Sequence, residues 1–217
     1  MTGHAGALQL RARIQRCLLH PAAKPVVFLA CLLPMAWLVF AVFTDALGAN
    51  PAEALIRSTG DWTLRFLCLV LSITPLRVAG SLPALARFRR MLGLFVFFYA
   101  LLHLTSYSWL DMGFDLADIV RDVLQRRFIL VGSAAVLLLT ALALTSFNRA
   151  IRALGARRWQ GLHRLVYGVA GLALLHFFWM RSGKNDYAEV AVYAVIIGLL
   201  LGWRVRHAWL ARQARPS

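Results

Sequence analysis

Six long apolar runs, separated by short polar segments, dominate the hydrophobic pattern of this 217-residue chain. They cover residues 26–43, 62–78, 91–110, 128–147, 162–180 and 189–203. Each run approaches the ~20 apolar residues that a membrane-spanning helix needs. Because a backbone in lipid must satisfy its own hydrogen bonds, runs of this length must be helical. The pattern therefore predicts an all-α integral membrane bundle of six transmembrane helices, in which successive helices are antiparallel.

The connection between the third and fourth runs, residues 111–127, has a pattern of its own. Apolar residues recur there at helical spacing, namely Leu116, Ile119, Val120, Val123 and Leu124. Asp115 is a candidate N-cap, Asp118 falls in the first turn, and Arg126 and Arg127 are expected in the last turn, where they suit the helix dipole. The segment predicts a short amphipathic helix on the outer leaflet. It is either a connector or a docking surface for a partner.

Basic residues divide unevenly between the two sides of such a bundle. The segments on the side of the termini hold 17 of the 24 lysines and arginines, the opposite segments hold 6, and Arg65 lies inside the second run. An excess of positive charge marks the cytoplasmic side, so both termini are predicted to be cytoplasmic. The chain then divides into a basic N-terminal tail, 1–25, a six-helix transmembrane domain, 26–206, and a C-terminal tail, 207–217.

Composition supports a membrane protein, and the positions of the charges and cysteines argue against nucleic-acid binding, a disulfide framework and a zinc site. The chain is 60% hydrophobic and 15% charged, whereas soluble domains are nearer half apolar and a quarter charged. The net charge of +15 does not predict nucleic-acid binding, because the positive charges lie in short clusters between apolar runs. Cys17, Cys31 and Cys68 have neither the number nor the spacing of a disulfide framework or zinc site. The first run is longer than the apolar region of a signal peptide, so it is expected to be a retained span.

Two histidines lie inside apolar runs at matching depths. His103 is 12 residues beyond Met91, about 18 Å into the third span, and His176 is 14 residues beyond Leu162, about 21 Å into the fifth. Both spans run in the same direction, so the two imidazoles are expected to face each other in the outer half of the membrane. Such a pair can fill both axial positions of a haem iron, as cofactor sites in helix bundles often do. Polar contacts between helices remain the alternative from spacing alone.

A third histidine, His163, lies near the cytoplasmic surface and has no histidine at its depth on the third span. An ideal helix would turn it away from His176, unless the helix distorts near Gly168 or Gly171. It is a candidate ligand of a second haem, a contact for a propionate or a quinone headgroup, or an imidazole snorkelling at the interface. The remaining histidines lie in the tails or near the surface and are not expected to be ligands: His4, His20 and His207.

Several motifs together resemble the haem-binding membrane subunit of the bacterial periplasmic methionine sulfoxide reductase system, which belongs to the ferric-reductase-like transmembrane group. The motifs are RRMLGL at 89–94, LHLTSY at 102–107, LGARRWQGLHRLVY at 154–167, HFFW at 176–179, SITPL at 72–76 and LGANP at 47–51. The combination is specific, although each motif alone is weak. One departure is QRRF at 125–128, where an Arg-Pro-aromatic segment is expected.

The resemblance implies a b-type cytochrome of the bacterial inner membrane that holds one or two haems b. The three histidines of the family correspond to His103, His163 and His176 in this chain. Such a subunit would take electrons from the quinone pool or a cytoplasmic flavin reductase. It would pass them to a periplasmic molybdopterin methionine sulfoxide reductase, which repairs oxidised proteins. FMN is associated with the family, without residues that can be assigned here. The chain would be an electron-transfer subunit rather than the catalytic one.

Two other functions remain open. One is a different ferric-reductase or oxidase-like electron carrier, but such relatives usually have two histidine pairs and an attached flavin and nicotinamide domain. The other is a non-redox membrane protein that uses histidines as contacts between helices. A transporter would more often show broken helices and acidic residues at mid-membrane, whereas the nine acidic residues here lie at the outer side or its border.

Overall fold

The structure, a computed structural model, describes the backbone of residues 2–183 and 185–214. Every regular element within these residues is helical. The elements are α1 (Thr2–Leu19), α2 (Ala23–Phe43), α3 (Pro51–Ala79), the 3-10 helix η1 (Pro83–Phe88), α4 (Arg89–Leu110), α5 (Leu116–Gln125), α6 (Arg127–Leu144), α7 (Asn148–Leu162), the 3-10 helix η2 (His163–Leu165), α8 (Val166–Ser182) and α9 (Ala188–Gln213).

Six segments of the described chain are long and apolar enough to cross a membrane. They are α2, α3, η1 with α4, α6, α7 through α8, and α9. This finding confirms the predicted all-α bundle with six spans. The chain is therefore a multi-pass membrane protein. Many large apolar side chains on the outer surfaces of α2, α6 and α9 are exposed in the isolated chain, as lipid-facing side chains would be.

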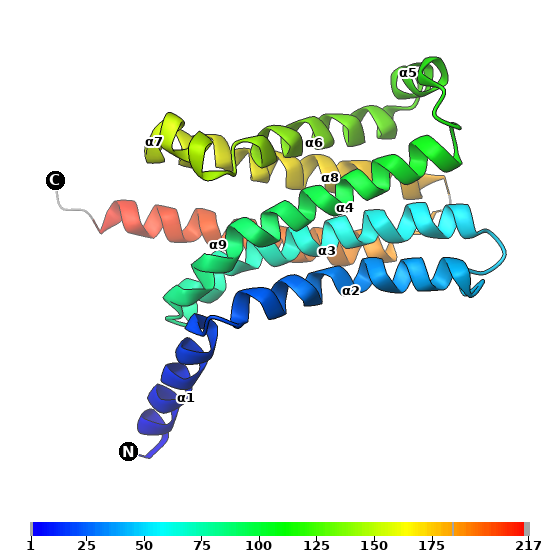
Figure 1. The fold of residues 1–217 in the computed structure, drawn as a ribbon. Coiled ribbons are helices and arrows are strands. Elements are labelled where there is room, and N and C mark those ends of the chain that lie inside the picture. The colour runs from blue at the N-terminus through cyan, green and yellow to red at the C-terminus, as the bar shows by residue number, and fades with distance from the viewer. Residues whose placement is uncertain (1, 184, 215–217) are drawn as a thin grey trace.

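The spans form an elongated bundle with distinct ends. Figure 1 shows α1 and the end of α9 at one end, and the short helix α5 at the other. Two views of the bundle show α1 projecting away from the other helices. Within the bundle, α3 packs most extensively on α4, and α6 packs on α8. These two helix pairs position the candidate site, because α4 carries His103 and α8 carries His176.

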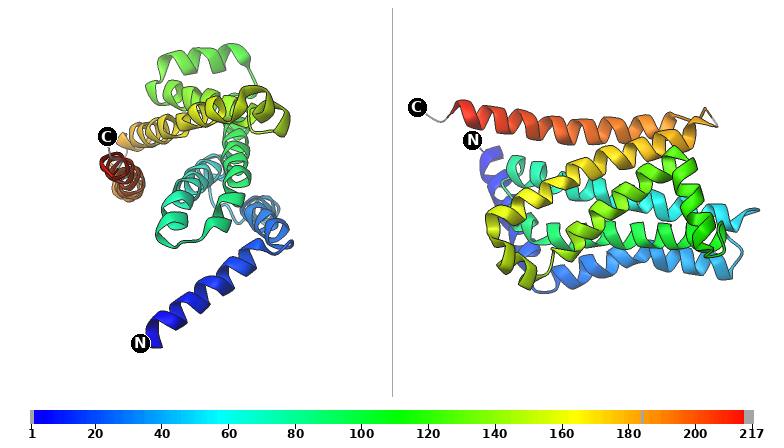
Figure 2. Two further views of the ribbon diagram at one scale, coloured as in Figure 1. Left: turned by 90° about the vertical axis from the view of Figure 1, so that its left-hand side faces the viewer. Right: turned by 90° about the horizontal axis from the view of Figure 1, so that it is seen from above.

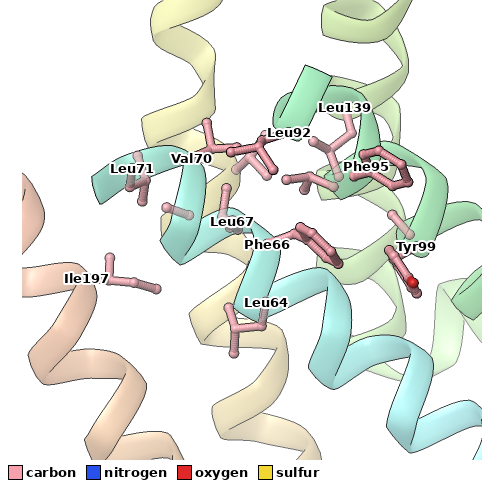
Figure 3. Packing of buried hydrophobic residues seen from close by; sticks show 14 of the residues in the cluster. Leu64, Phe66, Leu67, Val70, Leu71, Leu92, Phe95, Tyr99, Leu139 and Ile197 are labelled. Carbon is pink, nitrogen blue, oxygen red and sulfur yellow. The ribbon is translucent and has the colours of Figure 1, made fainter. Parts of the chain in front are cut away.

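The core lies mainly between α3 and α4 and extends to α6, α8 and α9. Leu67 and Leu71 of α3 are completely buried, as is Tyr99 of α4. Figure 3 shows these side chains with Leu139 of α6 and Ile197 of α9. Aromatic rings of α3 and α4 stack there, with Phe66 5.0 Å from Tyr99 between ring centroids. Close packing of this kind fixes the rotation of α4 about its axis, and therefore the direction of His103.

Tyr99 also joins α4 to α2 through its hydroxyl group. The hydroxyl donates to the Cys31 carbonyl at 2.8 Å and accepts from the Met35 amide at 3.1 Å. Cys31 and Met35 are four residues apart and would otherwise bond to each other in a regular helix. The hydroxyl is therefore inserted into the ladder of α2 beside Pro34, a residue type that kinks helices.

We expect Tyr99→Phe to reduce the free energy of unfolding by about 1 kcal/mol. The loss should be modest, because the Met35 amide and Cys31 carbonyl can bond to each other once the hydroxyl is gone. Thermal unfolding of the purified protein in detergent measures it, with Phe98→Leu as a control for a ring change on the same helix. An unchanged midpoint for Tyr99→Phe would show that the inserted hydroxyl contributes nothing.

The helices extend beyond the predicted apolar runs in three places. The second span begins at Pro51 instead of residue 62, because Asn50 caps it by accepting from the Glu53 amide and Pro51 fits the first turn. The N-terminal segment expected as a tail forms α1, which is rich in strong helix formers. At the other end of the chain, α9 continues through the segment expected as a C-terminal tail as far as Gln213.

The helix predicted in the connection between the third and fourth spans is present as α5. Asp115 caps it as predicted, accepting from the amides of Ala117 and Asp118. The expectation that Arg126 and Arg127 occupy its last turn is wrong. Arg126 has an extended backbone that ends α5, and Arg127 is the first residue of α6. The Arg126 side chain instead pairs with Asp122, one turn earlier.

Candidate functional site

His103 of α4 and His176 of α8 face each other across the bundle. Their ring centroids are 6.1 Å apart and their planes are inclined by 76°. His103 is 7 residues before the end of α4, and His176 is 6 residues before the end of α8, so both lie about 10 Å from the end of the bundle that carries α5. The structure thus confirms that the two imidazoles meet near that end.

Both imidazoles are oriented by backbone carbonyl groups. Nδ1 of His103 lies 2.9 Å from the Ile56 carbonyl oxygen, and Nδ1 of His176 lies 2.6 Å from that of Phe128. A carbonyl oxygen only accepts, so each Nδ1 carries the proton and donates it. Each Nε2 is then left with a free lone pair, the form in which a neutral histidine binds metal. Histidine ligands commonly make such a bond through their other nitrogen, which fixes the ring orientation.

A cavity of about 360 Å³ surrounds the pair. Both imidazoles line it, and its walls come from α3, α4, α5, α6 and α8. The deep part is lined by apolar side chains: Leu67, Val96, Leu139 and Val169. Charged side chains gather toward the end of the cavity near α5: Glu53, Arg57, Asp61, Asp111 and Arg126. Ligand pockets typically have volumes of about 300–1,000 Å³ and combine apolar walls with a few polar groups.

These features fit an iron porphyrin. Two imidazoles that bind one metal from opposite sides, with bonds of about 2 Å, place their ring centroids about 6–6.5 Å apart, close to the 6.1 Å seen here. No group of three or more histidine, cysteine or carboxylate side chains suited to a metal ion occurs among the described residues. A porphyrin needs only two protein ligands, because it supplies four nitrogens itself. Arg57 and Arg126 line the end of the cavity near α5, where they pair with Glu53 and Asp122.

Two residues that line the cavity beside the imidazoles are absent from the sequence-based predictions: Gly60 of α3 and Gly132 of α6. The sequence-based prediction named Gly168 and Gly171 instead, as points where the fifth span could bend. Glycine inside an apolar run is a signal of close approach to another group, but the approaching group is visible only once the helices are packed.

The helix α5 forms part of the cavity wall. Ile119 and Val123 line the cavity from α5. Asp122, on the same helix, is buried and accepts a hydrogen bond of 2.5 Å from the Tyr107 hydroxyl of α4. Its other carboxylate oxygen pairs with Arg126. This cluster attaches α5 to the helix that carries His103.

The fold does not place His163 beside His103 and His176. It begins η2, the 3-10 turn that separates α7 from α8, at the far end of α8 from His176. Its ring lies 4.0 Å from Trp159, and Nε2 is 3.4 Å from the Thr145 hydroxyl of the loop after α6. The Trp159 indole donates to the Thr145 carbonyl at 2.9 Å. The distortion of the fifth span therefore lies at residues 163–165 rather than at Gly168 or Gly171.

His20 and His207 lie apart from the cavity. His20 accepts from the Ala22 amide at 3.2 Å in the turn between α1 and α2. His207 stacks on Trp203 within α9, with ring centroids 5.0 Å apart. The His4 side chain lies outside the described part of the structure.

Comparison with known proteins places the chain in a family. Residues 59–174 match the family described as "Ferric reductase like transmembrane component". A protein-methionine-sulfoxide reductase heme-binding subunit MsrQ from Polaromonas naphthalenivorans (strain CJ2) is 67% identical over 203 residues, covering 94% of this chain and 93% of that protein. Proteins of the same name from Herminiimonas arsenicoxydans and Bordetella pertussis are each 50% identical, covering 87% and 88% of this chain and 87% and 92% of those proteins. No solved structure matches the chain. The chain belongs to the ferric reductase like transmembrane family and, within it, to the family of heme-binding subunits of protein-methionine-sulfoxide reductase.

Proposed function

We propose that this protein is a b-type cytochrome subunit that carries electrons across the bacterial inner membrane for the reduction of methionine sulfoxide in proteins. Membership of a ferric-reductase-like membrane family supports an electron-transfer role, and the relatives named above are heme-binding subunits. The observation that carries the proposal is the pair of imidazoles with ring centroids 6.1 Å apart, both oriented by backbone carbonyls.

In this proposal His103 and His176 would be the two protein ligands of the haem iron. A haem with two axial imidazoles has no open coordination position and supplies one-electron transfer rather than oxygen or peroxide chemistry. The two carbonyl bonds would fix the orientation of each ring and leave Nε2 free as the ligand atom. The apolar walls would exclude water from the cofactor.

The proposed direction of transfer is from the cytoplasmic side to the periplasm. The uneven distribution of arginines supports cytoplasmic termini, and the histidine pair then lies toward the periplasmic face. The donor would be the quinone pool or a cytoplasmic flavin reductase. The acceptor would be a periplasmic molybdopterin methionine sulfoxide reductase, the catalytic subunit. FMN belongs to the same proposal through the family resemblance, and no residues are assigned to it.

The absorption spectrum of the purified protein tests the haem. We expect Soret and α bands that sharpen on reduction with dithionite, and one or two haems b per chain by pyridine haemochrome assay. A protein without these bands would rule the proposal out and favour a non-redox membrane protein. The acceptor is tested by mixing the reduced protein with an oxidised catalytic subunit and methionine sulfoxide, which should reoxidise the haem. NADPH oxidation by the isolated chain would instead favour another ferric-reductase-like carrier.

His163→Ala should leave the haem between His103 and His176 in place. His163 contacts Trp159 and Thr145 at the other end of α8, so its loss should not disturb the paired imidazoles. The α-band position and the haem count per chain measure this. A fall from two haems to one would assign His163 to a second haem. Loss of all haem would show that His163 is needed for the site between His103 and His176, contrary to this prediction.

A further inference from the structure

We infer that Gly60 and Gly132 are positioning residues, each providing the space in which one of the paired imidazoles lies against the backbone of a neighbouring helix. His103 projects from α4 onto α3 at Gly60, and His176 projects from α8 onto α6 at Gly132. A larger residue at either position would push the imidazole away from its carbonyl partner and change the direction of Nε2.

The contact is closest at Gly132. A Cβ atom added there would lie 2.8 Å from Nδ1 and 3.0 Å from Cε1 of His176. Real Cβ atoms essentially never approach other atoms so closely, so the ring or the helix would have to move. The Nδ1 atom is also the one that donates to the Phe128 carbonyl. Alanine at position 132 would therefore act on the bond that orients the ring.

Gly60 makes the same kind of contact with His103. A Cβ atom there would lie 3.2 Å from both Nδ1 and Cε1 of the ring, so the ring would have to move by a few tenths of an ångström, less than at Gly132. We therefore expect Gly60→Ala to have the same kind of effect as Gly132→Ala, but a smaller one.

The glycine and the accepting carbonyl have the same spacing in both helices. Each accepting carbonyl belongs to the residue four positions before the glycine, Ile56 before Gly60 and Phe128 before Gly132. In a helix this places the carbonyl one turn before the glycine on the same face. The missing side chain exposes the backbone, so that the imidazole reaches a carbonyl already used by the helix. A carbonyl cannot be removed by substitution, so the glycine is the position at which this orientation can be changed.

A double-mutant cycle on the haem-free protein tests the steric contact directly. Thermal unfolding in detergent would be measured for the unsubstituted protein, Gly132→Ala, His176→Ala and the combined variant. We expect Gly132→Ala to lower the unfolding midpoint only when His176 is present. In the His176→Ala background the same change should be neutral or raise the midpoint, because alanine favours a helix more than glycine does. An equal loss in both backgrounds would overturn the inference, because glycine would then serve the packing of α6 itself.

Haem binding provides the second test, and this part rests on the proposed function. Loss of a group that orients a metal ligand typically weakens metal binding about 10–100-fold. We expect a loss of that order for Gly132→Ala, a smaller loss for Gly60→Ala, and a shift of the midpoint potential in any haem retained. Gly171→Ala on α8 is the matched control, since a Cβ there would meet nothing within 4 Å. If the unsubstituted protein and Gly132→Ala bind haem with the same affinity and potential, the inference fails and the proposed function stands. If the unsubstituted protein binds no haem, the proposed function fails while the cycle still decides the contact.

Discussion

His103→Ala and His176→Ala should each abolish stable haem binding. In the proposed site each histidine supplies one of only two protein ligands to the iron, and removal of a ligand should cost more than the roughly 10–100-fold loss that follows loss of an orienting group. One imidazole would remain as a ligand. The cavity walls around it are mostly apolar and offer the iron no second ligand. The Soret band of the purified variants and their haem content by pyridine haemochrome assay measure the effect.

Two other histidines provide controls for this prediction. His20→Ala and His207→Ala remove imidazoles that lie apart from the cavity, in a turn and on α9, and should retain the full haem content. Circular dichroism and elution from a sizing column establish that all four variants keep the fold. Haem at full occupancy in His103→Ala or His176→Ala, with an unchanged α band, would exclude this pair as the axial ligands.

Tyr107→Phe should lower the free energy of unfolding by about 1.5–3 kcal/mol, because hydrogen bonds to charged groups contribute that much. The Tyr107 hydroxyl donates to the buried Asp122 carboxylate at 2.5 Å. Without it, one carboxylate oxygen is left without its donor in a poorly hydrated position, and Arg126 must balance the charge alone. The loss should also loosen α5, because this bond attaches α5 to α4.

Two measurements distinguish these effects. Thermal unfolding in detergent reports the loss of stability, and limited proteolysis between residues 111 and 127 reports the release of α5. The comparison variant is Tyr187→Phe, a tyrosine at the start of α9 whose ring stacks on Phe178 and whose hydroxyl plays no part in the α5 contact. Equal unfolding midpoints and equal cleavage rates for Tyr107→Phe and the unsubstituted protein would contradict the proposed attachment.

The sequence predicted the number of spans and the meeting of His103 with His176 because both depend on simple distances. A helix rises by a constant amount per residue, so two histidines at similar depths in parallel spans must lie at similar heights. Whether they also face each other depends on the rotation of each helix. That rotation is set by packing around residues such as Leu67 and Tyr99, which no single-helix pattern reveals.

The helix ends were less predictable, because an apolar run marks the part of a helix that lies in lipid and not the whole helix. The start of α3 illustrates this. Its first turns carry Glu53, Arg57 and Asp61, which break the apolar pattern. Asn50 nevertheless caps the helix, and the three charged side chains line the end of the cavity near α5. Gly60 and Gly132 were not predicted, because the sequence does not show which group a glycine in a helix contacts. That group, the imidazole, comes from a neighbouring helix.

The histidine pair lies about 10 Å from the end of the bundle that carries α5. This position determines how the membrane potential would affect electron transfer. In the proposed orientation an electron from a cytoplasmic donor crosses most of the bilayer before it reaches the haem. A bacterial membrane is negative inside, so this outward movement of negative charge is favoured, by about 2.3 kcal/mol for each 100 mV across the full thickness. Transfer from a cytoplasmic donor through this subunit would therefore dissipate the membrane potential rather than build it, and an energised membrane would help to drive these electrons toward the periplasm.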